Sequence, residues 1–154
     1  MTSYRYRLNR IWGEGPTVSL IGLNPSTADD AVDDATTRRL IGILSRLGFG
    51  SYFLVNLFAY RTKDPQELFA AWRRGTDICG PENSQAIREA LNNYQTCVAM
   101  WGAVKAMPAP KVIADVRRGV RPGVLKCLGL TKGGAPRHPL YLAYDDVRLQ
   151  DWPR

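Results

Sequence analysis

Two asparagines and one histidine are the side chains of this sequence whose types and surroundings best suit ligand chemistry. Asn24 comes directly after an apolar run, Asn56 stands inside a second one, and His138 lies on a loop that also carries two prolines. A carboxamide donates and accepts hydrogen bonds at the same time, and an imidazole can donate one to a group that gains negative charge. We therefore treat these three residues as candidates for binding and polarising a polar ligand.

Each of these residues also has an ordinary structural explanation. Asn24 precedes Pro25, and Asn-Pro often begins a turn. Asn56 lies within the apolar run 51–58, where an amide must find hydrogen-bond partners or cost about 1–3 kcal/mol. Either the backbone or a ligand can supply those partners. A lone histidine is more often structural than catalytic, although the prolines near His138 stiffen its loop.

Four aspartates follow the first asparagine: Asp29, Asp30, Asp33 and Asp34. Carboxylates at this density could hold a divalent cation, although their spacing is not that of an EF-hand loop. The same acids precede a predicted helix, where aspartate caps the first turn and complements the helix dipole. Both explanations stay open, and Asp33 and Asp34 are secondary candidates for the site.

Cysteine and histidine usage disfavours other metal sites. The three cysteines, Cys79, Cys97 and Cys127, form no C-x-x-C pair, and His138 is the single histidine. Thiolate zinc sites, disulfide frameworks and histidine-rich metal sites are therefore not expected. We predict no metal and no cofactor.

The elements that must position the candidates can be read from the apolar pattern. In chain order, the pattern is β-β-α-β-α-α-β-α-β, which is typical of a parallel sheet covered by helices. We predict an α/β protein with a single domain over 1–154: three α/β/α layers, with a central, mainly parallel four-stranded sheet plus an N-terminal edge strand. The predicted strands cover 4–12, 17–23, 51–58, 96–101 and 123–130, and the predicted helices cover 36–47, 65–74, 81–94 and 110–119.

Polar segments follow all four predicted parallel strands. The carboxyl ends of parallel strands meet at one edge of a sheet, where ligands bind. We therefore expect one crevice that brings these segments together. Besides Asn24, Asn56 and His138, its predicted binding residues are Gly22, Pro25, Ser26, Tyr60, Arg61, Trp101, Lys132, Arg137, Leu140 and Tyr141.

The chain is basic, with 21 Lys and Arg against 14 Asp and Glu, a formal net charge of +7. Most of these cations are arginine, which binds phosphate bidentately, so nucleic acid or a nucleotide is the favoured partner, and solubility alone is the alternative explanation of the charge. Lys132 and the two glycines after it could cradle a phosphate, but without a P-loop pattern. No apolar run approaches the ~20 residues of a membrane span and the N-terminus lacks a secretory signal, so we expect a soluble, cytoplasmic protein.

Motifs spread along the whole chain resemble a bacterial and phage family, the domain-of-unknown-function family 1643. The family name implies no activity. The motifs are, in order, YRYRLNRIW, IGLNPSTAD, the Asp33-Asp34 pair, VNLFAYRTKDP, GPEN, MWG and TKGGAPRHPLYL.

The order of the clusters also resembles the uracil-DNA glycosylase superfamily, a parallel α/β/α fold. The resemblance implies that Asn24 positions the water that attacks the sugar, Asn56 hydrogen-bonds the base edge, and His138 stabilises the departing base. It further implies that Leu140 or Tyr141 fills the gap left by a flipped nucleotide, with Lys132 and Arg137 holding phosphates. The matching segments are GLNP at 22–25, FLVN at 53–56, MWG at 100–102 and HPL at 138–140.

The chain departs from that superfamily at several positions. No aromatic residue lies between Ser26 and Arg39, where the superfamily places one to stack on the base, and the second Ser-Pro of the last motif is absent. Ser26 stands where strict uracil enzymes carry a tyrosine that excludes 5-substituted pyrimidines, which implies a pocket open to a bulky or modified base. The aspartate cluster has no counterpart in the superfamily.

We therefore expect an N-glycosidase-like enzyme, a DNA glycosylase that acts on a base in DNA, with Asn24 and His138 as its catalytic residues. One alternative is a non-catalytic module that binds a nucleotide or nucleic acid in the same crevice. A third hypothesis is a magnesium-dependent nucleotide hydrolase that uses Asp29, Asp33 and Asp34.

Overall fold

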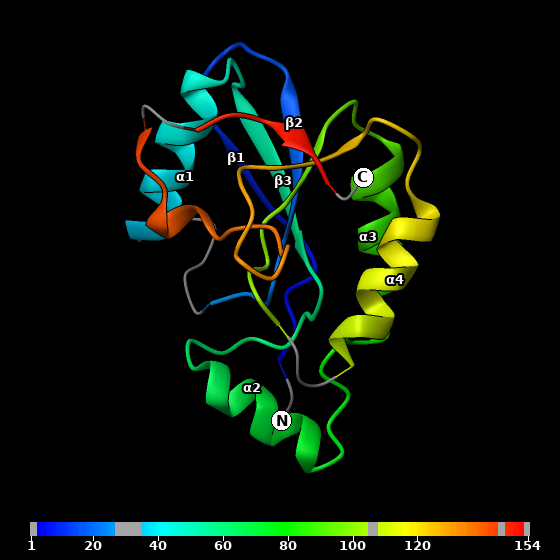
Figure 1. Cartoon of the computed structure of the whole chain (residues 1–154). Coiled ribbons are helices and arrows are strands. Elements are labelled where there is room, and N and C mark those ends of the chain that lie inside the picture. The colour runs from blue at the N-terminus through cyan, green and yellow to red at the C-terminus, as the bar shows by residue number, and fades with distance from the viewer. Residues whose placement is uncertain (1–2, 27–34, 105–107, 145–146, 153–154) are drawn as a thin grey trace.

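The structure of the protein is a computed structural model that describes residues 3–26, 35–104, 108–144 and 147–152. A six-stranded sheet in the order β1-β3-β2-β4-β5-β6 forms its centre (Figure 1). The two outer strands, β1 (Leu8–Ile11) and β6 (Gln150–Asp151), run antiparallel to their neighbours. The inner strands, β2 (Thr17–Gly22), β3 (Ser51–Asn56), β4 (Cys97–Ala99) and β5 (Leu125–Cys127), run parallel.

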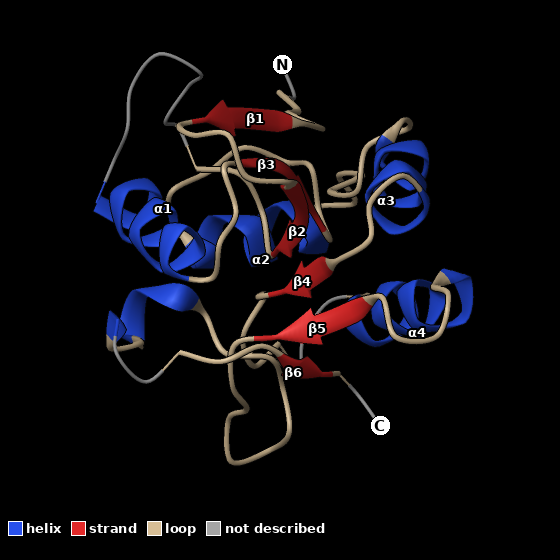
Figure 2. Cartoon of the chain, turned by 90° about the horizontal axis from the view of Figure 1, so that it is seen from above, coloured by secondary structure: helices blue, strands red, loops and turns tan. Residues whose placement is uncertain are grey.

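Helices cover both faces of the sheet, as Figure 2 shows from above. On one face lie α1 (Ala35–Arg46) and the short 3-10 helix η1 (Pro139–Tyr141), and on the other lie α3 (Asn83–Asn92) and α4 (Ala109–Gly119). The remaining helix, α2 (Pro65–Arg73), follows β3 and lies beyond the end of the sheet (Figure 1). The side chain of Asp64 caps α2 by accepting a hydrogen bond from the backbone N–H of Gln66 at 2.9 Å.

Two apolar cores hold the layers together, one on each face of the sheet. Neighbouring residues of β2 point to opposite faces, so Leu20 packs with Ile43 of α1, whereas Ile21 belongs to the core that contains Ala86 of α3 and Val116 of α4. All five of these side chains are buried. Because the central strand is apolar on both faces, the sheet needs a helical layer on each side.

The segment after η1 is held on α1 by an aromatic contact. The ring of Tyr144 faces the guanidinium groups of Arg39 and Arg46, which lie 4.8 and 4.2 Å from its centroid. The ring packs over Gly42, where a Cβ would come within 2.8 Å of a ring carbon. Arg39 also donates a hydrogen bond to the carbonyl of Leu142.

The predicted α/β class, the four parallel strands, the N-terminal edge strand and the four helices are confirmed. The count of strands was wrong, because β6 extends the sheet beyond β5. Both residues of β6 are exposed, so they leave no apolar alternation in the sequence. The strand predicted over 4–12 is also shorter: β1 pairs with β3 only over residues 8–11, and Tyr4 forms an isolated bridge with Tyr60.

Candidate functional site

A cavity of about 300 Å³ lies at the carboxyl edge of the parallel strands, on the face that α1 covers. Its walls come from the ends of β2, β3 and β4, from the first turn of α1 and from the loop before η1. This volume is at the lower end of the range of ~300–1,000 Å³ that is usual for small-molecule sites. Seven of the residues predicted for the site line the cavity: Gly22, Asn24, Pro25, Ser26, Asn56, Trp101 and His138.

The side chain of Asn56 is buried in this cavity without a hydrogen-bond partner in the described part of the chain. Asn56 is the last residue of β3 and is only 5% exposed. Its backbone carbonyl is bonded, but its carboxamide makes no hydrogen bond to a described residue. The amide atoms are not among the fully buried side-chain atoms that lack a partner, so water or a ligand in the cavity can reach them and make their hydrogen bonds.

Gly22 provides the space in which the Asn56 amide lies. The two residues are directly opposite each other in the pairing of β2 with β3. A Cβ on Gly22 would come within 2.6 Å of Oδ1 of Asn56, closer than real contacts of this kind. The glycine at the end of β2 is therefore required by the position of the amide, and both residues belong to the wall of the cavity.

Asn24 uses its amide hydrogens within the fold. Its Nδ2 lies within hydrogen-bonding distance of three backbone carbonyl oxygens, at 3.0 Å from Thr62, 3.2 Å from Pro25 and 3.3 Å from Tyr60. The backbone N–H of Thr62 also donates to the carbonyl of Pro25 at 3.1 Å. These bonds join the loops that follow β2 and β3, and they leave the Oδ1 atom as the part of Asn24 available to a ligand.

The loop after β5 returns to the sheet edge and places His138 there. The backbone N–H of Thr131 donates to the carbonyl of Ala135 at 2.8 Å, and the N–H of Ala135 donates to the side-chain hydroxyl oxygen of Thr131 at 3.1 Å. The returning segment is held on both sides. The N–H of Gly102 donates to the carbonyl of Pro136, and the N–H of Arg137 donates to the carbonyl of Gly129, each at 2.9 Å. The next residue along the chain is His138.

The imidazole of His138 has a defined tautomer. Its Nδ1 accepts a hydrogen bond from the backbone N–H of Leu140 at 3.1 Å and thereby caps η1, so the ring proton is on Nε2. Burial lowers the pKa of His138 below its ordinary value of 6.5, because desolvation disfavours the charged ring. The cavity therefore carries a neutral imidazole with a hydrogen-bond donor at Nε2.

Trp101 forms a rigid part of the wall. It is 3% exposed and meets Trp152 edge to face, with 5.1 Å between ring centroids and 86° between ring planes. The indole N–H of Trp152 donates to the carbonyl of Gly134 at 2.9 Å. Trp101 also lines an adjoining cavity together with Lys132, so it separates two hollows at the same edge.

Several predicted residues do not line the cavity. Tyr60 donates to Glu67 at 3.2 Å, the backbone of Arg61 pairs with Ser3, and Arg137 packs beside Gly129. Lys132 lines the adjoining cavity, and Leu140 is exposed on η1. The side chain of Tyr141 and the aspartates 29, 30, 33 and 34 lie outside the described residues.

The cavity also contains residues that the sequence analysis missed. Arg5 reaches it because β1 is antiparallel to β3, which places the chain before β1 at the carboxyl edge of β3. An antiparallel edge strand is the signal that would have indicated Arg5. The other missed residues are polar Thr36 and Thr37 of α1 and the apolar or proline residues Leu8, Leu23, Leu40, Tyr52, Leu54, Pro65 and Met100.

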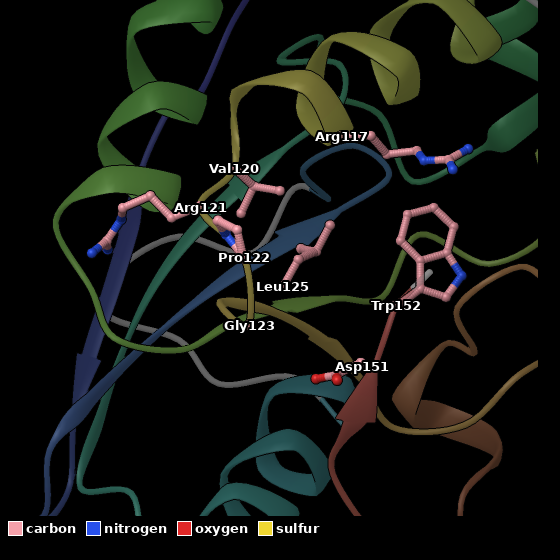
Figure 3. A pocket seen from close by; sticks show the side chains of 8 residues that line it. All are labelled: Arg117, Val120, Arg121, Pro122, Gly123, Leu125, Asp151 and Trp152. Carbon is pink, nitrogen blue, oxygen red and sulfur yellow. The ribbon is translucent and has the colours of Figure 1, made fainter. Parts of the chain in front are cut away.

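A second cavity, of about 330 Å³, lies near the amino end of β5 (Figure 3). Arg117 and Arg121 at its rim extend away from each other (Figure 3), and Arg121 donates to the carbonyl of Tyr94 at 3.2 Å. Asp151 forms an ion pair with Lys126. These polar groups are open to solvent or bonded within the fold, so this cavity offers no buried polar group for a ligand.

The described residues form neither a cluster of metal ligands nor a membrane-spanning helix. Within 3–26, 35–104, 108–144 and 147–152, no group of three or more His, Cys, Asp or Glu side chains could hold a metal ion. In the same ranges, no helix has the length and apolar character needed to cross a membrane.

Comparison with known proteins gives one match. No curated protein matches the chain, and no solved structure matches it. The relation to the uracil-DNA glycosylase superfamily therefore has no support from these comparisons. The chain does match a family described as Protein of unknown function (DUF1643) over residues 5–140. The resemblance to this family is confirmed, and the chain belongs to the DUF1643 family.

Proposed function

We propose that the protein is an N-glycosidase-like enzyme that hydrolyses the bond between a base and its sugar in DNA. The observation that carries the proposal is the amide of Asn56, which is 5% exposed, has no partner among the described residues and lines a cavity with His138. An amide in this state is a preorganised donor and acceptor for the edge of a nucleobase. The neutral imidazole supplies a second donor from another wall.

The reaction is a hydrolysis that these groups can assist. Water attacks the anomeric carbon while the carbon–nitrogen bond breaks, and the electron pair of that bond stays on the base. The attacking water loses a proton to solvent, and the departed base takes a proton from solvent. The Nε2 donor of His138 stabilises that negative charge, which is the usual role of a preorganised donor near a leaving group. The Oδ1 atom of Asn24 accepts a hydrogen bond from the attacking water, since the Nδ2 hydrogens are bonded to backbone carbonyls.

The motif order that resembles the uracil-DNA glycosylase superfamily supports this assignment. Its base-reading and first motifs correspond to Asn56 and to Gly22 through Pro25, which lie in one cavity with His138. The small Ser26 and the apolar wall formed by Leu40, Leu54 and Met100 favour a bulky or modified base over plain uracil.

DNA is the proposed partner because of the charge and the surroundings of the cavity. The formal net charge of +7 favours a phosphate backbone. A base inside a duplex must leave the stack before it can enter the cavity. Leu140 lies on η1, two residues after His138, and is 39% exposed, so it is placed to fill the gap that the base leaves in the duplex. Lys132 and Arg137 on the preceding loop would contact phosphates.

The test is mass spectrometry of the small molecules released from DNA. The protein is incubated with a uracil-containing duplex and with genomic DNA from phages whose bases are modified. We expect a free base from at least one DNA, and at least ~100-fold less of it with His138→Ala or Asn24→Ala. Arg117→Ala, at the opposite end of the sheet, is the matched control and should release as much base as the wild type. Equal release by all variants would refute the mechanism.

One observation favours a second candidate, a module that binds a nucleotide or nucleic acid without cleaving it. The amide hydrogens of Asn24 are used in joining two loops, a structural role that requires no catalysis. In this case the wild type releases no base from any of the DNAs. It still binds a duplex, with an affinity that falls steeply as the salt concentration rises.

A further inference from the structure

Asn83, the first residue of α3, holds the backbone at the point where β3 ends. It is only 2% exposed, and its Nδ2 donates to the carbonyl oxygens of Asn56 at 2.9 Å and Leu57 at 3.0 Å. Both amide hydrogens are therefore used on two consecutive peptide groups. Because Nδ2 faces two carbonyl oxygens, the orientation of the amide is fixed by the fold.

The same two peptide groups are also held from the opposite side. The N–H of Leu57 donates to the carbonyl of Gly22 at 2.9 Å, and the N–H of Phe58 donates to the carbonyl of Leu23 at 3.0 Å. The peptide that links Asn56 to Leu57 is thus bonded through its N–H to β2 and through its C=O to Asn83. This fixes the backbone from which the Asn56 side chain projects, next to Gly22.

We infer that Asn83 is the positioning residue of the site: by holding the carbonyls of Asn56 and Leu57, it fixes the Asn56 amide in the direction needed to read a base. The inference rests on the proposed function for its catalytic consequence. Asn83 does not line the cavity that contains Asn56, so it acts through the backbone alone.

Within the described part of the chain, only the nitrogen of the Asn83 carboxamide forms hydrogen bonds. Oδ1 is buried and has no hydrogen-bond partner in the described part of the chain. The two hydrogens on Nδ2 therefore account for the hydrogen bonding of this side chain. Leucine has a similar size and lacks those hydrogens, so Asn83→Leu removes the two bonds and little else. A groove of about 360 Å³ between α3 and α4 lies beside the residue and leaves room for adjustment.

Ser19→Ala is the matched control for a loss of buried hydrogen bonding between the sheet and α3. Ser19 is fully buried in β2 and its hydroxyl donates to the carbonyl of Ala90 at 2.6 Å. Its removal weakens the same sheet-to-helix contact at a distance from the cavity. A general loss of stability would therefore affect both variants alike, whereas positioning of Asn56 would distinguish them.

The experiment measures NMR spectra of the free protein and base release by the same samples. The side-chain NH2 signal of Asn56 is assigned by its loss in Asn56→Leu. In Asn83→Leu we expect that signal to shift or broaden and the amides of Leu57 and Phe58 to exchange with solvent at least tenfold faster than in Ser19→Ala. Unchanged signals and exchange in a folded Asn83→Leu would overturn the inference. If that variant does not fold, Asn83→Ser, which keeps one donor, is measured by the same criteria.

The two proposals can fail separately. If the wild type releases a base from the DNAs above, kcat for that DNA should fall at least tenfold in Asn83→Leu and less than twofold in Ser19→Ala. Equal losses of kcat in the two variants would show a structural role only and overturn the inference. If the wild type releases no base, the proposed function fails, and the NMR measurements alone decide whether Asn83 positions Asn56.

Discussion

Buried polar side chains have different environments at the two ends of the parallel strands. In the amino-terminal half, Ser19 is fully buried and donates to the carbonyl of Ala90, and the hydroxyl of buried Ser51 lies 2.5 Å from that of exposed Thr17. At the carboxyl end, Asn56 is also buried, at 5% exposed, yet its amide has no partner among the described residues. The fold satisfies Ser19 and Ser51 by itself, whereas the hydrogen bonds of the Asn56 amide remain available to a ligand.

The two cavities differ in the same way. The cavity near the amino end of β5 has about the same volume as the one that contains Asn56, 330 against 300 Å³. Its charged residues are exposed or paired, as for Asp151 with Lys126. Volume therefore does not distinguish a binding site from a surface hollow in this molecule. An amide that is open to the cavity and makes no hydrogen bond to a described residue does, because its hydrogen bonds remain to be made.

Replacing Asn56 should give the largest effect on function and the smallest on stability. We expect Asn56→Leu to lower base release by ~10²–10³-fold, since an essential donor is lost. The free energy of unfolding should stay unchanged or rise by up to ~1 kcal/mol, because an unsatisfied buried amide is replaced by an apolar group. Chemical denaturation and the release assay measure the two quantities. A fall in stability of more than ~1 kcal/mol would mean that Asn56 is satisfied within the fold, and the contrast between the two ends would disappear.

Gly22→Ala should lower both base release and the free energy of unfolding. The added Cβ would lie 2.6 Å from Oδ1 of Asn56, so the amide must move. We expect a loss of ~10²-fold in kcat, as for other displacements of about 1 Å, and a destabilisation of ~1–3 kcal/mol from overpacking. The release assay and thermal unfolding test this together. The double variant Gly22→Ala/Asn56→Leu still has a branched side chain at position 56 beside residue 22, so it should be no more active than Asn56→Leu alone. A double variant that is more active than Asn56→Leu would contradict the assignment.

Ser19→Ala should lower stability and leave base release unchanged, which is the opposite of the effect expected for Asn56→Leu. The hydroxyl donates to a carbonyl of α3, and its loss leaves that acceptor buried, so we expect a destabilisation of ~1–3 kcal/mol. Base release per folded molecule should stay within twofold of the wild type, because the residue lies away from the cavity. Denaturation and release are measured on the same preparation. A loss of release comparable with that of Asn56→Leu would show that the two ends are not independent.

The smallest expected effect is the loss of stability caused by protonation of His138 at acidic pH. Because burial lowers the pKa of His138 in the folded protein below 6.5, the unfolded chain binds a proton more readily. The contribution of His138 to stability is therefore complete above pH ~6.5 and is lost as the pH falls through the folded value. Protonation of Nδ1 would also remove the cap on η1. Thermal unfolding between pH 7 and pH 5 should show a smaller decline for His138→Gln than for the wild type; equal declines would contradict the shift.

The fold could be predicted largely because its parallel strands are short apolar runs that end in polar residues. Leu20 and Ile21 of β2 and the range Phe53 to Val55 of β3 are apolar on both faces, which is what a strand between two helical layers requires. The pair Gln150–Asp151 carries no such pattern, because both side chains are exposed and the pairing with β5 comes from the backbone. Its existence depends on tertiary structure alone.

The site could be predicted only in part, for a related reason. Asn24, Asn56 and His138 stand out because each is a polar residue at the end of an apolar run or on a stiff loop. Arg5 lines the same cavity only because of the antiparallel pairing of β1, and Asn83 acts through carbonyl groups that no side-chain pattern reveals. Conversely, Tyr60 and Arg61 follow a strand end but do not line the cavity: the Tyr60 hydroxyl donates to Glu67, and the backbone N–H of Arg61 donates to the carbonyl of Ser3.

The contact of Tyr144 with Arg39 and Arg46 has a consequence for how the cavity opens. The contact fastens the segment after His138 onto α1, and the first turn of α1 carries Thr36 and Thr37 on the facing wall. Because the two walls are joined, the segment after η1 and α1 should exchange their amide hydrogens as one cooperative unit. A chain shortened to end before residue 144 would keep every lining residue and still lose the fixed distance between the walls.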